Sequence, residues 1–202
     1  ALGGTPAILF GVQIVTGVFL LFHYVPTPSD AYNSVSTITY DIRFGWFIRS
    51  VHKWASELMI ITVMLHMTRV YFTGAYRKPR EINWIIGVFM FFVTLGLGFT
   101  GYSLVYDQLS YWAAMVGTEI TESAPLIGPL AADFIRGGSE VGANTLTRLY
   151  VFHIVIFPAL LAGLVVLHII FVRLHGVTEY EFDEEKKLEH KTFPLFPDHV
   201  LT

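Results

Sequence analysis

Four long apolar stretches constrain the fold of this chain more than any other feature of its sequence. They cover about residues 5–25, 48–72, 82–106 and 149–172. Each is long enough to cross a bilayer as a helix, which takes about 20 apolar residues. None alternates with the period of two that short barrel strands show. The sequence therefore predicts an all-α integral membrane protein built on a bundle of four transmembrane helices.

The composition agrees with a membrane domain and excludes several kinds of chemistry. Only 14% of the residues are charged and 53% are hydrophobic, which is more apolar than an ordinary soluble domain. The net charge of −3 gives no sign of a nucleic-acid partner. The sequence has no cysteine, so these residues form no disulfide, iron–sulfur cluster or reactive thiolate. The first apolar stretch lacks a basic flank, and we interpret it as a membrane span rather than a signal peptide.

The charges of the loops predict the orientation of the bundle. Basic residues gather in the short loop TGAYRKPRE (residues 73–81) and at Arg173, whereas the loop between the third and fourth spans carries five acidic residues. Lysine and arginine mark the cytoplasmic loops of membrane proteins. We therefore expect both termini on the negative, cytoplasmic side, and short surface helices of the long loop on the positive side.

Two of the predicted spans each carry two histidines. His52 and His66 are fourteen residues apart, and His153 and His168 are fifteen apart. Fourteen helical residues make about four turns and rise roughly 21 Å, so both side chains of a helix point the same way at two depths. The two spans run in the same direction. We therefore expect His52 to face His153 near the positive side and His66 to face His168 near the negative side.

Facing imidazoles at two depths favour two haems, each held by two axial histidines. A zinc site is disfavoured, because zinc draws all its ligands to one point. Helix-packing histidines are the simpler alternative, but ionisable residues inside a membrane are rare and usually functional. The fourth span has one extra residue between its histidines, and we expect a kink at Pro158 to absorb it.

Glycines and arginines recur at the levels of the two histidine pairs. Gly3 and Gly17 in the first span are fourteen residues apart, as are Gly87 and Gly101 in the third. A missing side chain at these levels would let a macrocycle approach the backbone, although ordinary helix packing also uses such glycines. Four arginines could meet anionic haem propionates or simply mark the membrane interface. They are Arg49 and Arg148 for the positive-side haem, and Arg69 and Arg173 for the negative-side haem.

Several motifs resemble the N-terminal half of cytochrome b, and the cytochrome b6 type in particular. They are FGWFIRSVHKW (residues 44–54), LHMTRVYFTGAYRKPRE (65–81), TGYSLVYDQLSYWA (100–113) and TLTRLYVFH (145–153) with Leu-His fifteen residues later. The resemblance covers about residues 1–176, which we predict to form a di-haem domain. Residues 177–202 would be a charged extension that leads toward a C-terminal-half partner. The four histidines match the family's haem ligands one for one.

The resemblance implies a subunit of a quinol–cytochrome c oxidoreductase complex in an energy-transducing membrane of bacterial or thylakoid-like type. In that family, quinol is oxidised on the positive side, and one electron goes to a Rieske iron–sulfur protein and then to a c-type cytochrome. The other electron crosses two non-covalent b-type haems and reduces quinone on the negative side, which moves protons across the membrane (the Q cycle). The partners implied are the Rieske protein, the c-type cytochrome and a C-terminal-half cytochrome b subunit, in a dimeric complex.

The family would place its quinol pocket over the helix that follows the third span. The residues implied are Tyr111, Trp112, Ala113 and Val116, which by spacing alone would equally suit an interfacial aromatic belt. Ala1 stands where the photosynthetic branch has a cysteine that holds a third haem, so we expect no covalent third haem.

Two details of the quinol site depart from the family's pattern. Val105-Tyr106 replaces a frequent Pro-Trp before Asp-Gln, and the acidic motif that completes the quinol site is expected from another chain. Two other function classes remain open. One is a di-haem membrane anchor of a dehydrogenase or reductase, and the other is a transporter or structural bundle without a cofactor. The surface helices expected after the third span argue against the anchor, and the stacked histidine pairs argue against a bundle without a cofactor.

Overall fold

The computed structural model describes residues 2–176, and this part of the chain is helical apart from its turns and loops. Its elements are α1 (Gly4–Leu21), α2 (Ala31–Tyr40), α3 (Gly45–Phe72), α4 (Glu81–Ser103), α5 (Gln108–Glu122), α6 (Gly128–Arg136), α7 (Ala143–Val151), the π-helical turn η1 (Phe152–Ile156) and α8 (Phe157–His175). The predicted all-α class is confirmed for these residues. The predicted charged extension, residues 177–202, lies outside the described residues.

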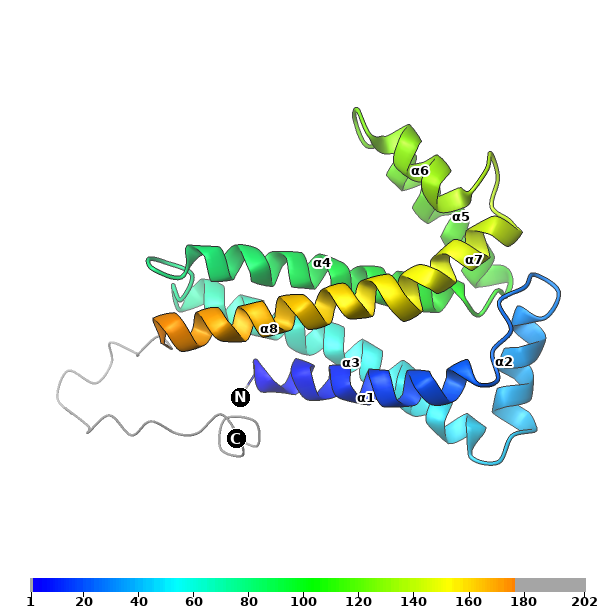
Figure 1. The fold of residues 1–202 in the computed structure, drawn as a ribbon, viewed down its shortest axis with the longest axis horizontal. Coiled ribbons are helices and arrows are strands. Elements are labelled where there is room, and N and C mark those ends of the chain that lie inside the picture. The colour runs from blue at the N-terminus through cyan, green and yellow to red at the C-terminus, as the bar shows by residue number, and fades with distance from the viewer. Residues whose placement is uncertain (1, 177–202) are drawn as a thin grey trace.

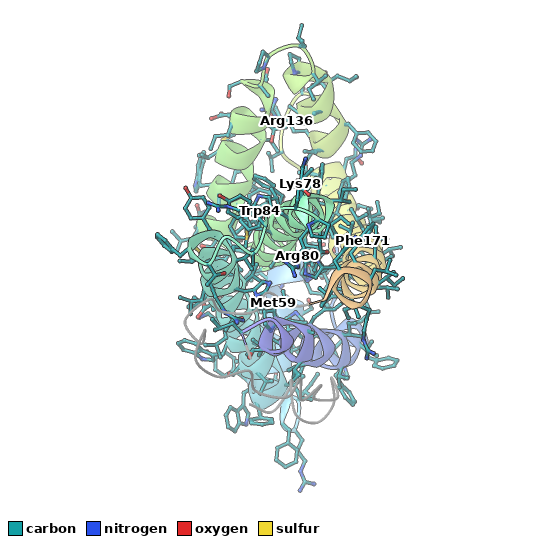
Figure 2. All side chains as sticks on the ribbon, turned by 90° about the vertical axis from the view of Figure 1, so that its left-hand side faces the viewer. Met59, Lys78, Arg80, Trp84, Arg136 and Phe171 are labelled. Atoms are coloured by element: carbon teal, nitrogen blue, oxygen red, sulfur yellow. The ribbon has the colours of Figure 1, made fainter. Side chains whose placement is uncertain are left out.

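Four helical rods lie side by side: α1, α3, α4 and the continuous helix α7–η1–α8 (Figure 1). Figure 2 views them roughly end-on and shows α5 and α6 standing off from the bundle. α1 packs along α3, and α4 packs along α8. Within residues 2–176, α3 and α8 are not a closely packed pair. The bundle is therefore made of two helix pairs, and each pair contributes one histidine-bearing helix.

Three of the rods are long and apolar enough to cross a membrane by length and composition alone. They are Gly4–Leu21, Glu81–Ser103 and Ala143–His175. α3 has 28 residues and reaches about 42 Å at 1.5 Å per residue, but Arg49, Lys53 and Glu57 make its first half less apolar. Its length and its packing along α1 identify α3 as the remaining rod, second in chain order, of the predicted four-helix bundle.

The two ends of the bundle carry different elements (Figure 1). The start of α1, the α3–α4 loop and the end of α8 lie at one end, which we name the loop end. α2 and the α5–α6 hairpin lie at the other end, which we name the hairpin end. The chain therefore runs toward the hairpin end in α1 and α4, and back toward the loop end in α3 and α8, as the predicted connections require. The short surface helices occur where the long loop between the third and fourth spans was predicted.

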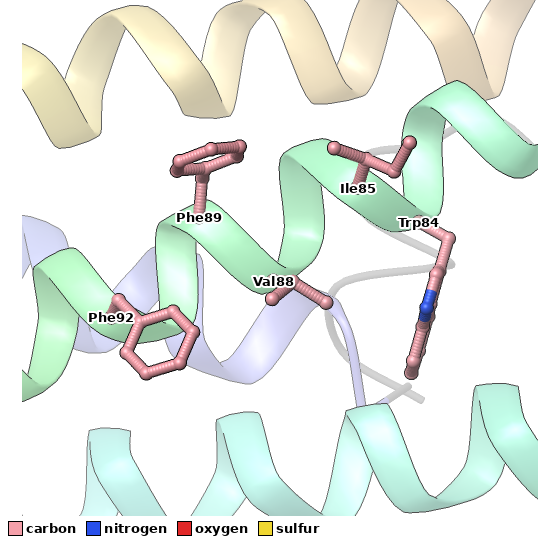
Figure 3. Close-up of a pocket in the computed structure, with 5 residues that line it drawn as sticks. All are labelled: Trp84, Ile85, Val88, Phe89 and Phe92. Carbon is pink, nitrogen blue, oxygen red and sulfur yellow. The ribbon is translucent and has the colours of Figure 1, made fainter.

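The outward faces of the rods are rich in large apolar side chains. Exposed examples from three different helices are Phe19, Phe92 and Val166. On α4, an open apolar depression is lined by Trp84, Ile85, Val88, Phe89 and Phe92 (Figure 3). Apolar surface this extensive is typical of contact with lipid rather than water.

The chain leaves α1 at Leu21, before the predicted end of the first span at residue 25. The hydroxyl of Tyr24 donates a hydrogen bond to the carbonyl of Leu104 (2.7 Å), and its ring stacks on Tyr150 with 5.7 Å between centroids. Burial, and then the neighbouring Tyr150, raise the pKa of the Tyr24 phenol above its usual value. Tyr24 thus ties the end of the first rod to the end of the third.

The α5–α6 hairpin is held by a largely buried arginine. Arg136 pairs with Glu122 (2.7 Å) and donates to the hydroxyl of Thr118 (3.0 Å). Its own carbonyl accepts a hydrogen bond from Thr145 (2.7 Å), at the start of the fourth rod. Because a charge this far from water is costly unless it is paired, these contacts hold the hairpin in one position relative to the bundle.

A π-helical turn absorbs the extra residue between the two histidines of the fourth rod. η1 spans Phe152–Ile156 and includes His153. A π turn accommodates one more residue than an α turn, so a fifteen-residue spacing here matches fourteen on α3. The prediction placed the adjustment at Pro158. The structure puts it in the turn that precedes Pro158, a residue that has no N–H to donate back into the continuous helix.

Gly45, the first residue of α3, provides the sharpest stability prediction. A Cβ atom at this position would overlap the carbonyl of Ile38, a backbone group that cannot move aside cheaply. We expect Gly45→Ala to lower the free energy of unfolding by about 1–3 kcal/mol, the usual cost of overpacking. The measurement is the thermal unfolding midpoint of the detergent-solubilised protein. Gly163→Ala in α8, with open space around it, is the control, and equal midpoints for the two variants would contradict this prediction.

Candidate functional site

The structure brings the four span histidines together in the two predicted pairs. The rings of His52 and His153 have centroids 6.3 Å apart and planes at 74°. The rings of His66 and His168 have centroids 6.4 Å apart and planes at 78°. All four side chains are half-buried. We name His52/His153, nearer the hairpin end, the first pair, and His66/His168, nearer the loop end, the second pair.

The separation within each pair fits one metal ion between two imidazoles. An imidazole nitrogen binds a metal at about 2 Å. Two such bonds in line, with the offset from each nitrogen to its ring centre, put the centroids about 6 Å apart. Direct contact between packed rings would need no such equal spacing at two depths. Within residues 2–176, no group of three or more histidine, aspartate or glutamate side chains could hold a metal ion alone. Each pair is therefore suited to a metal whose other ligands come from a macrocycle.

Each predicted glycine lies against a histidine of its own level. The four contacts are Gly17 with His52, Gly101 with His153, Gly3 with His66 and Gly87 with His168. A Cβ at Gly101 would lie 2.6 Å from Cε1 of its histidine, whereas one at Gly87 would lie 3.7 Å from Cε1 of its own. The glycines thus leave room beside Cε1 of each imidazole ring, most critically at Gly101.

Two threonines that were not predicted contact the first pair. Thr16 Oγ1 lies 2.8 Å from Nδ1 of His52, and Thr100 Oγ1 lies 3.1 Å from Nδ1 of His153. Both threonines are buried. A signal was present in the sequence, because each threonine directly precedes a predicted glycine in a repeated Thr-Gly dipeptide at residues 16–17 and 100–101. Spacing alone does not show that the hydroxyls reach the rings.

The second pair lacks such contacts. The Nδ1 atoms of His66 and His168 are buried and have no hydrogen-bond partner. The equivalent positions at this level are apolar. Leu2 lies fourteen residues before Thr16, and Ile86 lies fourteen residues before Thr100. The two pairs therefore share ring geometry and flanking glycines, but differ in what meets the outer ring nitrogen.

The four predicted arginines have different environments. Arg49 is half-buried in α3, one turn before His52, while Arg69 and Arg173 are exposed near the ends of α3 and α8. Arg148 donates to the carbonyls of Asp133 (3.3 Å) and Phe134, at the end of α6, and its guanidinium lies 5.4 Å from the centre of the Phe134 ring. In this structure Arg148 therefore binds the α5–α6 hairpin rather than pointing freely toward the first pair.

The predicted quinol-pocket residues all lie on α5, but they do not form one face. Tyr111 packs against the buried cluster that joins α5 to α2, the end of α4 and α7. Trp112 and Val116 are exposed, and Ala113 is half-buried. Beside them, Tyr106 has a left-handed backbone (φ 54°), and burial, followed by the neighbouring Tyr111, raises the pKa of its phenol. An open pocket next to this turn is lined by Tyr32, Tyr106, Asp107, Gln108 and Leu109.

Comparison with known proteins agrees with this geometry. The family described as cytochrome b/b6/petB matches residues 1–176. Cytochrome b6 of Heliobacterium modesticaldum is 49% identical over 178 residues, which are 88% of this chain and 84% of that protein. Cytochrome b6 of Prochlorococcus marinus is 42% identical over 177 residues, 88% of this chain and 81% of that protein.

A solved structure also matches the whole fold. A chain of the structure named "Hyperthermophilic respiratory Complex III" superposes with a TM-score of 0.85 and 32% sequence identity, over 99% of this chain and 54% of that chain. The present chain therefore spans about half the length of that solved chain.

Proposed function

This chain belongs to the cytochrome b/b6 family, and on that premise we propose that it is the di-haem subunit of a quinol–cytochrome c oxidoreductase complex. The proposal rests on the two histidine pairs. The ring centroids are 6.3 Å apart within the first pair and 6.4 Å apart within the second. His52 and His153 would hold one haem iron, and His66 and His168 the other. Each haem supplies one-electron redox chemistry when bound, and the protein supplies ligands, position and environment.

The arrangement of the pairs suits electron transfer across a membrane. The histidines of α3 are fourteen residues apart, or roughly 21 Å along the helix, which is most of the ~30 Å hydrocarbon core. The histidines of the two helix pairs would hold both macrocycles, and the flanking glycines would leave room for them. We propose that the hairpin end faces the positive side and the loop end faces the negative side, with both ends of the described chain on the negative side.

The proposal gives roles to the remaining predicted residues. Arg49, Arg69 and Arg173 would meet haem propionates or lipid headgroups, and Arg148 would do so only by leaving α6. The hairpin-end surface around Tyr111, Trp112, Ala113 and Val116 would form part of the quinol-oxidising pocket, completed by a C-terminal-half subunit. The expected partners are that subunit, a Rieske iron–sulfur protein and a c-type cytochrome in a dimeric complex. Both haems would be non-covalent, because the sequence offers no cysteine for a thioether.

A redox-titrated visible difference spectrum of the complex purified from membranes tests the proposal. We expect two b-type haems per chain that titrate at two different potentials, and a Rieske protein and a c-type cytochrome in the same preparation. A single haem component, or none, would contradict the di-haem assignment. Two haems in a complex with a dehydrogenase subunit and no Rieske protein would replace the proposed reaction with that of a membrane anchor.

A further inference from the structure

The two histidine pairs differ in what their outer ring nitrogens meet. In the first pair, both outer ring nitrogens meet a threonine hydroxyl, at 2.8 Å for His52 and 3.1 Å for His153. In the second pair, neither Nδ1 atom has a hydrogen-bond partner. The difference is the same on both sides of the first pair, since one threonine comes from α1 and the other from α4.

The direction of the bond at His52 follows from the other contact of its threonine. The hydroxyl of Thr16 lies 2.6 Å from the carbonyl of Val12, one turn earlier in α1. A hydroxyl has one hydrogen, and a carbonyl can only accept. Thr16 therefore donates to Val12 and accepts from the ring, which requires the hydrogen of His52 to sit on Nδ1. The Nε2 lone pair is then free for the iron.

The same reasoning applies at His153. The hydroxyl of Thr100 lies 2.7 Å from the carbonyl of Gly96, one turn earlier in α4. The Thr100 hydroxyl therefore donates its single hydrogen to the carbonyl of Gly96, and its oxygen accepts a hydrogen bond from Nδ1–H of His153. Both rings of the first pair are thus held in the tautomer that a metal ligand needs, by acceptors whose own orientation is set by a helix backbone.

Other groups near the rings do not distinguish the two pairs. A backbone carbonyl lies near one ring of each pair, that of Leu97 near His153 and that of Asn83 near His168, but the carbonyl of Asn83 makes no hydrogen bond to Nδ1 of His168. The flanking glycines also occur at both levels. The hydroxyls at residues 16 and 100 are therefore the contacts that are present at the first pair and missing at the second.

We propose that Thr16 and Thr100 are positioning residues that lower the reduction potential of the haem at the first pair relative to the haem at the second pair. This inference rests on the proposed di-haem function. An acceptor for Nδ1–H makes an imidazole a more basic ligand, and a more basic ligand stabilises ferric over ferrous iron. With both haems bound, a lower potential at the first pair would favour transfer of one electron from the first haem, which would be oxidised, to the second, which would be reduced. The threonines thus favour flow from the hairpin end to the loop end.

The experiment compares the complex carrying Thr16→Val, Thr100→Val or both changes with the wild-type complex. Valine keeps the shape of threonine and removes the hydroxyl. We expect each change to raise the reduction equilibrium constant of the first haem about tenfold, or about 59 mV for a one-electron couple, while the second haem titrates as before. The readout is a redox titration of each haem band, assigned by the histidine variants described in the Discussion.

Two further variants separate this role from plain packing. Thr94→Val is the matched control, because Thr94 is equally buried in α4 and bonds the carbonyl of Met90 but no histidine. Thr16→Ser and Thr100→Ser keep the hydroxyl and should keep the wild-type potential. If valine removes the first haem and serine retains it, the positioning role is supported.

Three outcomes would overturn the inference. They are an unchanged first-haem potential in the double valine variant, the same shift in Thr94→Val, or loss of the first haem with serine as well as valine. Each of these requires a wild-type complex that contains both haems. A wild-type complex without two haems would instead refute the proposed function, so the two failures are distinguishable.

Discussion

His52→Ala is expected to remove one of the two haems of the complex, and His66→Ala is expected to remove the other. Each histidine would supply one of only two protein bonds to its iron. Loss of a mere supporting group around a metal ligand already costs about 10–100-fold in affinity, so loss of the ligand itself should empty the site. The measurement is haem per chain together with the redox titration. Each variant should retain one haem, with a different potential in each case.

The control for these variants is His23→Ala. His23 is exposed just beyond the end of α1, so this change should leave both haems and both potentials intact. The pairing also predicts which variants share an effect. His153→Ala should lose the same haem as His52→Ala, and His168→Ala should lose the same haem as His66→Ala. If His52→Ala and His153→Ala removed different components, the assignment of the first pair would be wrong.

Gly101→Ala is expected to have the second large effect, because the new methyl group has no room. Its Cβ would lie 2.6 Å from Cε1 of His153 and 3.2 Å from both ring nitrogens. The ring cannot rotate away without giving up its bond to Thr100 and its aim at His52. Overpacking of this kind costs about 1–3 kcal/mol, so we expect haem occupancy at the first pair to fall about tenfold or more.

Gly87→Ala is the matched comparison at the second pair. Its Cβ would lie 3.7 Å from Cε1 of His168, an ordinary van der Waals distance, so occupancy of the second haem should change little. Haem content and the two titrating components, measured in both variants, check the contrast. Equal losses in the two variants would show that contact with the histidine ring is not what these glycines prevent. An intact first haem in Gly101→Ala would contradict the prediction directly.

Much of this architecture was predictable from two sequence patterns, which are the length of the apolar stretches and the spacing of histidines and glycines by fourteen or fifteen residues. Apolar stretches near 20 residues long leave a helix as the only way to satisfy the backbone in lipid. A fourteen-residue spacing returns to nearly the same helix face, so the pairing of His52 with His153 and of His66 with His168 follows from helix direction alone. The same argument placed the four glycines, and the structure sets each of them against its histidine.

Other features depended on contacts between residues far apart in the chain, which periodicity does not encode. The adjustment in the fourth rod was predicted at Pro158, but it occurs as the π turn Phe152–Ile156, since the ring of His153 must meet His52 at one depth. Arg148 was assigned to a haem, yet it binds carbonyls at the end of α6. That contact exists only because the α5–α6 hairpin folds back over the start of the fourth rod.

The sequence by itself determined the helical class, the order of the rods and the two levels of histidines, because hydropathy and helical periodicity are properties of the local chain. Only the tertiary structure decided which atoms meet at each level. Thr16 and Thr100 reach the first pair, whereas Leu2 and Ile86 stand at the equivalent positions of the second. A hydrogen bond requires a distance and an angle between two different helices. Those are set by how the rods pack against one another, and this packing makes two similar sites chemically unequal.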